Sequence, residues 1–190
     1  MCFSKDINKI QMFIKLKESK RFGVVDKRFE SSAEHTCSCI LLAQYFIKKI
    51  TNIDENKVIK MLSYHDLFNV FLIDINLNDP NWNKKKELEK EAYNKVILNL
   101  PEELIDDYKK YMQEFEEQKT IESKFAKAID VLEPVIHAYN QKEFWKEYKW
   151  TEKDLRKYKE KYFIEFPTIL KFFNDFVDYA NLNDYFYKEM

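Results

Sequence analysis

The chain has 190 residues and a formal net charge of −1, and 45% of its residues are apolar, enough to bury a sizeable core. The balance of charges argues against a dedicated nucleic-acid-binding protein, which would carry a basic excess. Gly23 is the single glycine, although average usage of about 7% would supply many more. Glycine-rich phosphate loops and all-β folds with many tight turns therefore lack the residue that they need. We expect an all-α fold in which residues 1–190 form a single domain.

Cysteine usage and hydropathy predict a soluble, cytoplasmic protein. Three cysteines, Cys2, Cys37 and Cys39, are too few for a disulfide framework, and we expect Cys37 and Cys39 to pack as small apolar side chains. The longest apolar stretch, Ile40–Ile47, is far shorter than the roughly 20 residues of a membrane span. The first residues lack the apolar core of a signal peptide. We therefore expect no membrane partner.

Apolar spacing predicts about eight helices and no convincing strand pair. The first helix is expected to start near Ile7 and to end near Arg21. A polar loop is expected from Gly23 to Glu30. The later helices are expected over residues 31–50, 54–66, 83–98, 101–118, 123–141, from 151 onward and 167–182, with 67–80 irregular or only briefly helical.

Polar caps mark the starts of three of these helices. Ser31, followed three residues later by Glu34, has the pattern of a capping box. Asp54 is expected to cap the third helix, and Thr151 with Asp154 repeats the reciprocal pattern.

The chain has three histidines, and two of them lie at predicted helix ends. His35 is near the start of the second helix, and His65 stands beside Asp66 at the end of the third. A short connection makes these helices antiparallel neighbours, so the two ends should lie close together. Imidazole and carboxylate ligands together suit a divalent metal of intermediate hardness. His137 is expected to pack in the core.

Three segments carry a resemblance to a known family: Ser32–Thr36 (SAEHT), Tyr64–Leu67 (YHDL) and Phe125–Pro134 (FAKAIDVLEP). They resemble the HD-domain metal-dependent phosphohydrolases, most of all the small single-domain branch that includes the 5′-deoxyribonucleotidases. The resemblance implies an HD-domain helical bundle and a divalent metal ion held by four residues, His35, His65, Asp66 and Asp130. Mixed ligands of this kind admit Mn²⁺, Fe²⁺, Co²⁺, Ni²⁺, Zn²⁺ or Mg²⁺.

Four further positions match the branch less uniformly. By resemblance, Arg21 binds the substrate phosphate and Glu30 holds the loop or the sugar. Asp74 matches an acidic position near the active site, where it would orient or deprotonate the attacking water. Asn69 is a departure, because the branch usually has a catalytic glutamate there and an amide cannot take a proton.

The leading hypothesis is a phosphohydrolase that acts on a small phosphate ester, with a (deoxy)nucleoside 5′-monophosphate as the best single substrate. The alternative is a metal- or nucleotide-binding protein with weak or no turnover, because Asn69 replaces the usual glutamate. A third reading, ranked lower, is diphosphate or cyclic-nucleotide hydrolysis. Family members are often homodimers, so a homodimer is expected by resemblance, and no nucleic acid polymer is expected as a partner.

Overall fold

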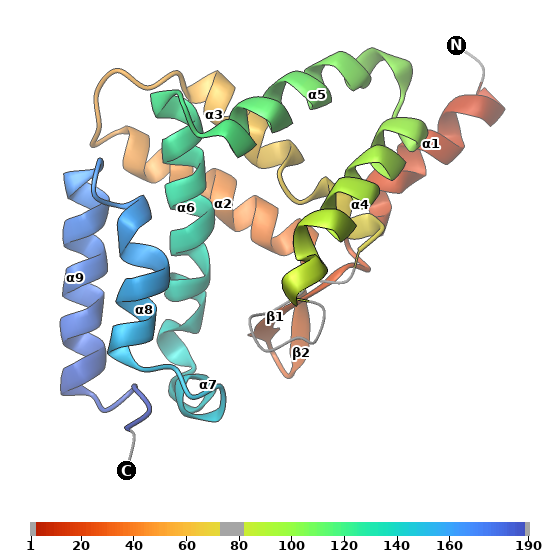
Figure 1. Cartoon of the computed structure of the whole chain (residues 1–190). Coiled ribbons are helices and arrows are strands. Elements are labelled where there is room, and N and C mark those ends of the chain that lie inside the picture. The colour runs from red at the N-terminus through yellow and green to blue at the C-terminus, as the bar shows by residue number, and fades with distance from the viewer. Residues whose placement is uncertain (1–2, 73–81, 189–190) are drawn as a thin grey trace.

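The computed structural model describes residues 3–72 and 82–188, and within them the chain is mostly helical (Figure 1). The nine α-helices of this part are α1 (Phe3–Lys15), α2 (Ser32–Ile47), α3 (Glu55–Tyr64), α4 (Lys85–Asn99), α5 (Glu102–Glu117), α6 (Ile121–His137), α7 (Lys142–Glu147), α8 (Glu152–Lys159) and α9 (Pro167–Leu182). Short 3₁₀ helices cover Leu67–Val70, Trp82–Lys84, Ala138–Asn140 and Glu160–Tyr162. The prediction of an all-α bundle is confirmed.

A two-stranded hairpin corrects the prediction for the first thirty residues. Strands β1 (Lys20–Val25) and β2 (Arg28–Ser31) pair antiparallel, whereas the sequence predicted a helix to Arg21 and then a loop. The helix α1 already ends at Lys15, so Arg21 lies on a strand. The turn residues Asp26 and Lys27 both have positive φ, at 43° and 69°, as a tight hairpin of primed type requires. Such a turn usually contains glycine or asparagine, and this one does not.

The predicted caps are confirmed. The Ser31 hydroxyl accepts from the backbone N–H of Glu34, whose carboxylate accepts from the backbone N–H of Ser31. Asp54 caps α3 by accepting from the backbone N–H of Lys57, and Thr151 caps α8 by accepting from that of Asp154, whose carboxylate accepts from the Thr151 hydroxyl rather than from its backbone N–H. The helix bounds differ from the predicted ones by a few residues, most clearly at α6, which ends at His137 rather than at 141, and the six-residue α7 was not predicted. A helix of fewer than two turns carries too little apolar periodicity to be recognised.

The hydrophobic interior consists of two clusters. The larger joins α2, α3 and α5 through α9, and the smaller joins α1, α4 and α5 to the segment after α3. Tyr64, the last residue of α3, packs against both clusters. In Figure 1, α8 and α9 lie beside α6, while α1 and α4 lie at the opposite side of the molecule. Within the described ranges, no helix is both long and apolar enough to cross a membrane.

Candidate metal centre and substrate pocket

The four side chains expected to bind a metal meet where α2, α3 and α6 pack together. His35 lies in the first turn of α2, His65 and Asp66 directly follow α3, and Asp130 is on α6. The imidazole rings of His35 and His65 have centroids 5.3 Å apart. Asp130 Oδ1 lies 3.2 Å from His35 Nε2 and 3.5 Å from His65 Nε2. Asp66 Oδ2 lies 3.9 Å and 3.8 Å from the same two nitrogens.

The hydrogen bond of His65 shows that this donor set fits a cation. Nδ1 of His65 lies 2.7 Å from the carbonyl oxygen of Leu62, which can only accept, so Nδ1 carries the proton. Nε2 then faces the carboxylates of Asp66 and Asp130. Among the residues that the structure describes, this buried nitrogen has no hydrogen-bond partner. Because an unpaired buried polar atom is costly and imidazole and carboxylate groups together suit a divalent cation, such a cation is the natural partner of this cluster.

Glu133 orients the second imidazole. Its Oε2 lies 2.8 Å from Nδ1 of His35. Glu133 is 3% exposed and lies one turn beyond Asp130 on α6. The carboxylate accepts a hydrogen bond from Nδ1, so Nε2 of His35 faces the centre. A carboxylate that accepts from a ligating histidine fixes its tautomer and raises its basicity as a ligand. Both imidazoles are therefore held with Nε2 inward.

Neighbouring cations keep the two aspartates ionised. Burial alone raises the pKa of Asp66, but Arg21 and the two histidines outweigh it, and the pKa lies below its ordinary value. Burial likewise opposes ionisation of Asp130, while Lys127 and the histidines hold the pKa of its carboxyl well below the usual range. The Arg21 guanidinium lies 2.5 Å from Asp66 Oδ2, and Lys127 Nζ lies 2.8 Å from Asp130 Oδ2. Both carboxylates are thus available as anionic ligands at neutral pH.

Cys39 is the remaining possible donor at the centre. Its Sγ lies 3.4 Å from His35 Nε2, and the side chain is fully buried. Burial raises the pKa of the thiol to about 12, so the sulfur stays protonated near neutral pH. Since a thiol binds metals as its thiolate, this environment agrees with the packing role expected from the sequence.

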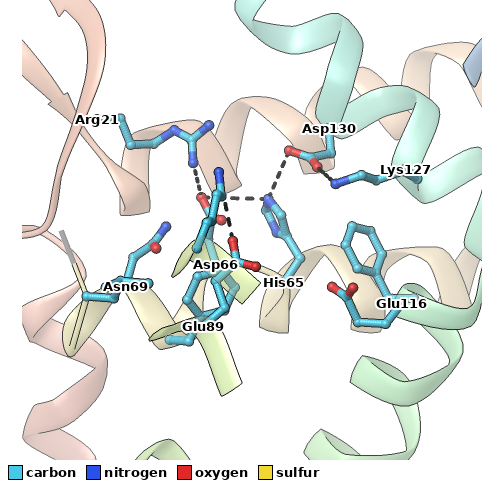
Figure 2. A pocket seen from close by; sticks show the side chains of 12 residues that line it. Arg21, His65, Asp66, Asn69, Glu89, Glu116, Lys127 and Asp130 are labelled. Carbon is cyan, nitrogen blue, oxygen red and sulfur yellow. Dashed lines mark hydrogen bonds and ion pairs between the residues drawn. The ribbon is translucent and has the colours of Figure 1, made fainter. Parts of the chain in front are cut away.

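A cavity of about 230 Å³ opens beside the centre. Figure 2 shows charged side chains of both signs around it. The cations are Arg21, Lys85 and Lys127, and the anions are Asp66, Asp130, Glu89 and Glu116, with His65, Phe68, Asn69, Leu72 and Phe115 completing the lining. The cavity has the size and the cations for a small anionic ligand.

Comparison with known sequences identifies the family. The sequence profile of the HD domain matches residues 13–169, which include every part of the centre. The chain belongs to the HD-domain family. No protein of curated function matches it.

Solved structures share the fold of this HD domain. A predicted metal-dependent phosphohydrolase from Magnetospirillum magnetotacticum MS-1 is similar with 24% identity and a TM-score of 0.85, over 98% of this chain and 96% of that one. A conserved hypothetical protein from Pyrococcus furiosus has 29% identity and a TM-score of 0.56, over 70% and 81% of the two chains. A protein from Pyrococcus horikoshii OT3 has 27% identity and a TM-score of 0.56, over 87% and 98%.

Of the residues proposed to bind the substrate or to act on the attacking water, some line the cavity of this HD domain and others do not. Arg21 lines the cavity, and so does Asn69, whose Nδ2 donates to the hydroxyl of Ser32 at 3.3 Å. Glu30 is 4% exposed and does not line the cavity; its Oε2 lies 3.9 Å from Nε of Arg21. Asp74 lies outside the described residues.

His137 does not have the core-packing role that its sequence position indicated. It ends α6, its Nδ1 lies 3.2 Å from Oε1 of Glu30, and its Nε2 donates to the carbonyl of Val24 at 3.0 Å. The interaction with Glu30, helped by Val24 and by the charge of Glu133, raises the pKa of His137 to about 9 despite partial burial.

Sequence reasoning missed five charged residues around the HD centre. Lys127 and Glu133 lie three residues before and after Asp130. On a helix this spacing places all three on one face, which is a signal that could have found them. Lys85, Glu89 and Glu116 lie on α4 and α5, two helices that the sequence indicated to be solvated. Their inward orientation depends on tertiary packing, and no local pattern distinguishes it.

Proposed function

We propose that this HD domain is a divalent-metal-dependent phosphohydrolase that releases phosphate from a small phosphate ester, with deoxynucleoside 5′-monophosphates as the substrates to test first. The observation that carries the proposal is the buried Nε2 of His65, which has no hydrogen-bond partner in the described ranges and faces Asp66 and Asp130 beside a cavity lined by Arg21. The name of the Magnetospirillum protein, a predicted metal-dependent phosphohydrolase of the same fold, supports the same reaction class.

The metal would be held by His35, His65, Asp66 and Asp130. When bound, a divalent ion would lower the pKa of a coordinated water toward about 7 and would offset charge on the phosphoryl group. The chain supplies the geometry. Glu133 and the Leu62 carbonyl hold the two imidazoles with Nε2 inward, so little reorganisation is needed on binding.

Arg21 is the residue best suited to bind the phosphate. A guanidinium has five donors in a planar fork, a geometry that matches phosphate oxygens, and in this site it is held in place by a hydrogen bond to Asp66. Lys85 and Lys127 add positive charge at the cavity wall. Together these cations favour a dianionic phosphate ester next to the metal.

Two carboxylates are candidates for taking a proton from the attacking water. Asp74 remains the candidate from the sequence. Glu89 is the candidate that lines the cavity, 3.8 Å from the ammonium of Lys85. Partial burial, together with the charges of Glu116 and Asp66, raises the pKa of Glu89. A carboxylate with a raised pKa is a better proton acceptor, so Glu89 is able to provide what Asn69 cannot.

The second candidate function is metal or nucleotide binding with little turnover, and Asn69 is the observation that favours it. Replacement Asn69→Glu separates the two functions. A rate increase of about two orders of magnitude, the scale of general-base assistance, would indicate a centre disabled at this position. A decrease would show that Asn69, through its bond to Ser32, belongs to a working site.

The direct test of the proposed function is phosphate release from ribo- and deoxyribonucleoside 5′-monophosphates with Mn²⁺, Co²⁺ or Mg²⁺. The control is Asp66→Ala, which removes one ligand. We expect release with at least one metal and nucleotide, and none from the variant. Bound metal without release from any nucleotide would contradict the proposed substrate class.

A further inference from the structure

Three side chains outside the cavity lining form a second cluster next to the metal centre: Glu30, Glu133 and His137. One potential ligand atom from each lies within 4.8 Å of the others. Both carboxylates are buried, at 4% and 3% exposure. Two buried carboxylates at this separation repel each other unless a positive charge lies between them.

His137 itself supplies that charge. Its Nδ1 lies 3.2 Å from Oε1 of Glu30 and 3.9 Å from Oε1 of Glu133. Its Nε2 donates to the backbone carbonyl of Val24, so both ring nitrogens face acceptors, as an imidazolium requires. The raised pKa of His137 agrees with this arrangement. The cluster is therefore satisfied by its own residues and needs no second metal.

The remaining oxygen of each carboxylate faces a different part of the candidate site. Oε2 of Glu133 accepts from Nδ1 of His35, a metal ligand. Oε2 of Glu30 lies 3.9 Å from Nε of Arg21, the phosphate-binding candidate. Arg21 in turn contacts Asp66, another ligand. His137 thus lies midway along a continuous chain of ionic contacts between the metal centre and the arginine.

We propose that His137 is a positioning residue that couples the two halves of the site, through Glu133 to the metal ligand His35 and through Glu30 to Arg21. Only the link through Glu30 to Arg21 rests on the proposed function, because it assumes that Arg21 binds the phosphate. Without the imidazolium, the two carboxylates move apart, and both His35 and Arg21 lose the orientation that their partners impose.

Gly23 supports this assignment from the opposite side of the cluster. A Cβ at this position would lie 3.1 Å from Glu30 Oε2 and 3.1 Å from His137 Nε2. The backbone of β1 thus passes directly against the pair. The only glycine of the chain lies where the hairpin must approach this pair closely.

Three variants separate the two branches. The measurements are Mn²⁺ affinity by calorimetry and the KM for the best nucleotide of the panel. Glu133→Gln is expected to weaken Mn²⁺ binding by about 10–100-fold, the usual effect of changing a partner of a ligating histidine. Glu30→Gln is expected to raise KM and leave Mn²⁺ affinity unchanged. His137→Gln is expected to do both.

Gln141→Ala is the matched control. Its Nε2 donates at 2.6 Å to the same Val24 carbonyl as His137, but no contact of Gln141 with either carboxylate occurs in the described part of the chain. Gln141→Ala therefore removes a hydrogen bond to the hairpin and keeps the ion pairs of His137. We expect this variant to have the Mn²⁺ affinity and the KM of the wild type. If His137→Gln fails to fold, His137→Lys retains a cation between the carboxylates, and near wild-type values are expected.

The outcomes distinguish this inference from the proposed function. Wild-type Mn²⁺ affinity and KM in a folded His137→Gln protein would overturn the coupling. The same would follow if Gln141→Ala weakened Mn²⁺ binding and raised KM as much as His137→Gln does. If the folded His137→Lys protein bound Mn²⁺ more weakly and also had a higher KM than the wild type, the assigned role of the charge would be wrong. Absence of phosphatase activity in the wild type would instead contradict the proposed function. In that case the Mn²⁺ affinities of the His137 and Glu133 variants still decide the metal branch.

Discussion

Nδ1 of His35 and the carboxylate of Glu133 form a buried hydrogen bond of 2.8 Å that fixes which face of the imidazole meets the metal centre. The Leu62 carbonyl does the same for His65 at 2.7 Å. The two histidines thus both present Nε2 to Asp66 and Asp130. This pre-orientation is the basis of the predictions that follow.

Metal binding is expected to stabilise the fold. A ligand that binds only the native state adds about 2.7 kcal/mol to the free energy of unfolding at 100 times its Kd. Urea denaturation with and without Mn²⁺ measures this difference. His65→Ala removes the unpartnered nitrogen and is expected to abolish the increase. An equal increase in His65→Ala would place the stabilising metal elsewhere.

Gly23→Ala is expected to destabilise the protein. The added Cβ would lie 3.1 Å from both Glu30 Oε2 and His137 Nε2, closer than ordinary van der Waals contact. Overpacking of this kind typically costs about 1–3 kcal/mol. The measurement is the urea midpoint, with Lys20→Ala on the exposed face of the same strand as the control. Unchanged stability in Gly23→Ala would show that the hairpin can move away from the pair.

Stability is expected to depend on pH through His137. Its pKa is raised by Glu30 from 6.5 to about 9 in the folded protein. The stability that this charge contributes is therefore complete below pH 6.5 and is lost as the pH rises through 9. The slope from one group is at most about 1.4 kcal/mol per pH unit.

The comparison is between wild type and His137→Gln, in urea titrations from pH 6 to 10 without metal. The advantage of the wild type over the variant is expected to shrink across the window between the two pKa values. Glu30 and Glu133 are the carboxylates that face His137, at 3.2 Å and 3.9 Å from its Nδ1. A constant difference between the two curves would mean that His137 does not change its charge there.

The positions of the candidate metal ligands were predictable where the signal was local or came as a family motif. The capping pair Ser31 and Glu34 fixes the start of α2 and with it the place of His35. The short α2–α3 connection correctly brought His35 next to His65. Asp130 came from the resemblance rather than from any local pattern, because nothing in a helical segment indicates which distant helix end it meets.

The hairpin and the charged wall of the cavity were not predictable. Asp26 and Lys27 adopt positive φ although neither is glycine, so the sequence carries no clear signal of the turn. Without that signal, Arg21 was assigned to a helix and not to β1. Glu89 belongs to a strongly charged helix that the sequence indicated to be solvated. Tertiary packing decides that this one carboxylate of α4 lines the cavity.

Glu89→Gln is expected to lower kcat by about 10²–10⁴-fold, the range of general-base assistance, with Mn²⁺ affinity little changed. Glu91→Gln, an exposed carboxylate on the same helix, is the control and is expected to retain the wild-type rate. Steady-state kinetics with Asp74→Asn alongside decides between the two candidate bases. Loss of kcat in Asp74→Asn with none in Glu89→Gln would assign the proton transfer to Asp74.

The central claim is that the cluster of His35, His65, Asp66 and Asp130 is a catalytic metal centre. Its most direct test is phosphate release by chelator-stripped protein as Mn²⁺ is added back, compared with Mn²⁺ binding measured by calorimetry. The account predicts no release from stripped protein, recovery with the same midpoint as binding, and no recovery in His65→Ala. Undiminished release after stripping, or full recovery in His65→Ala, would contradict it.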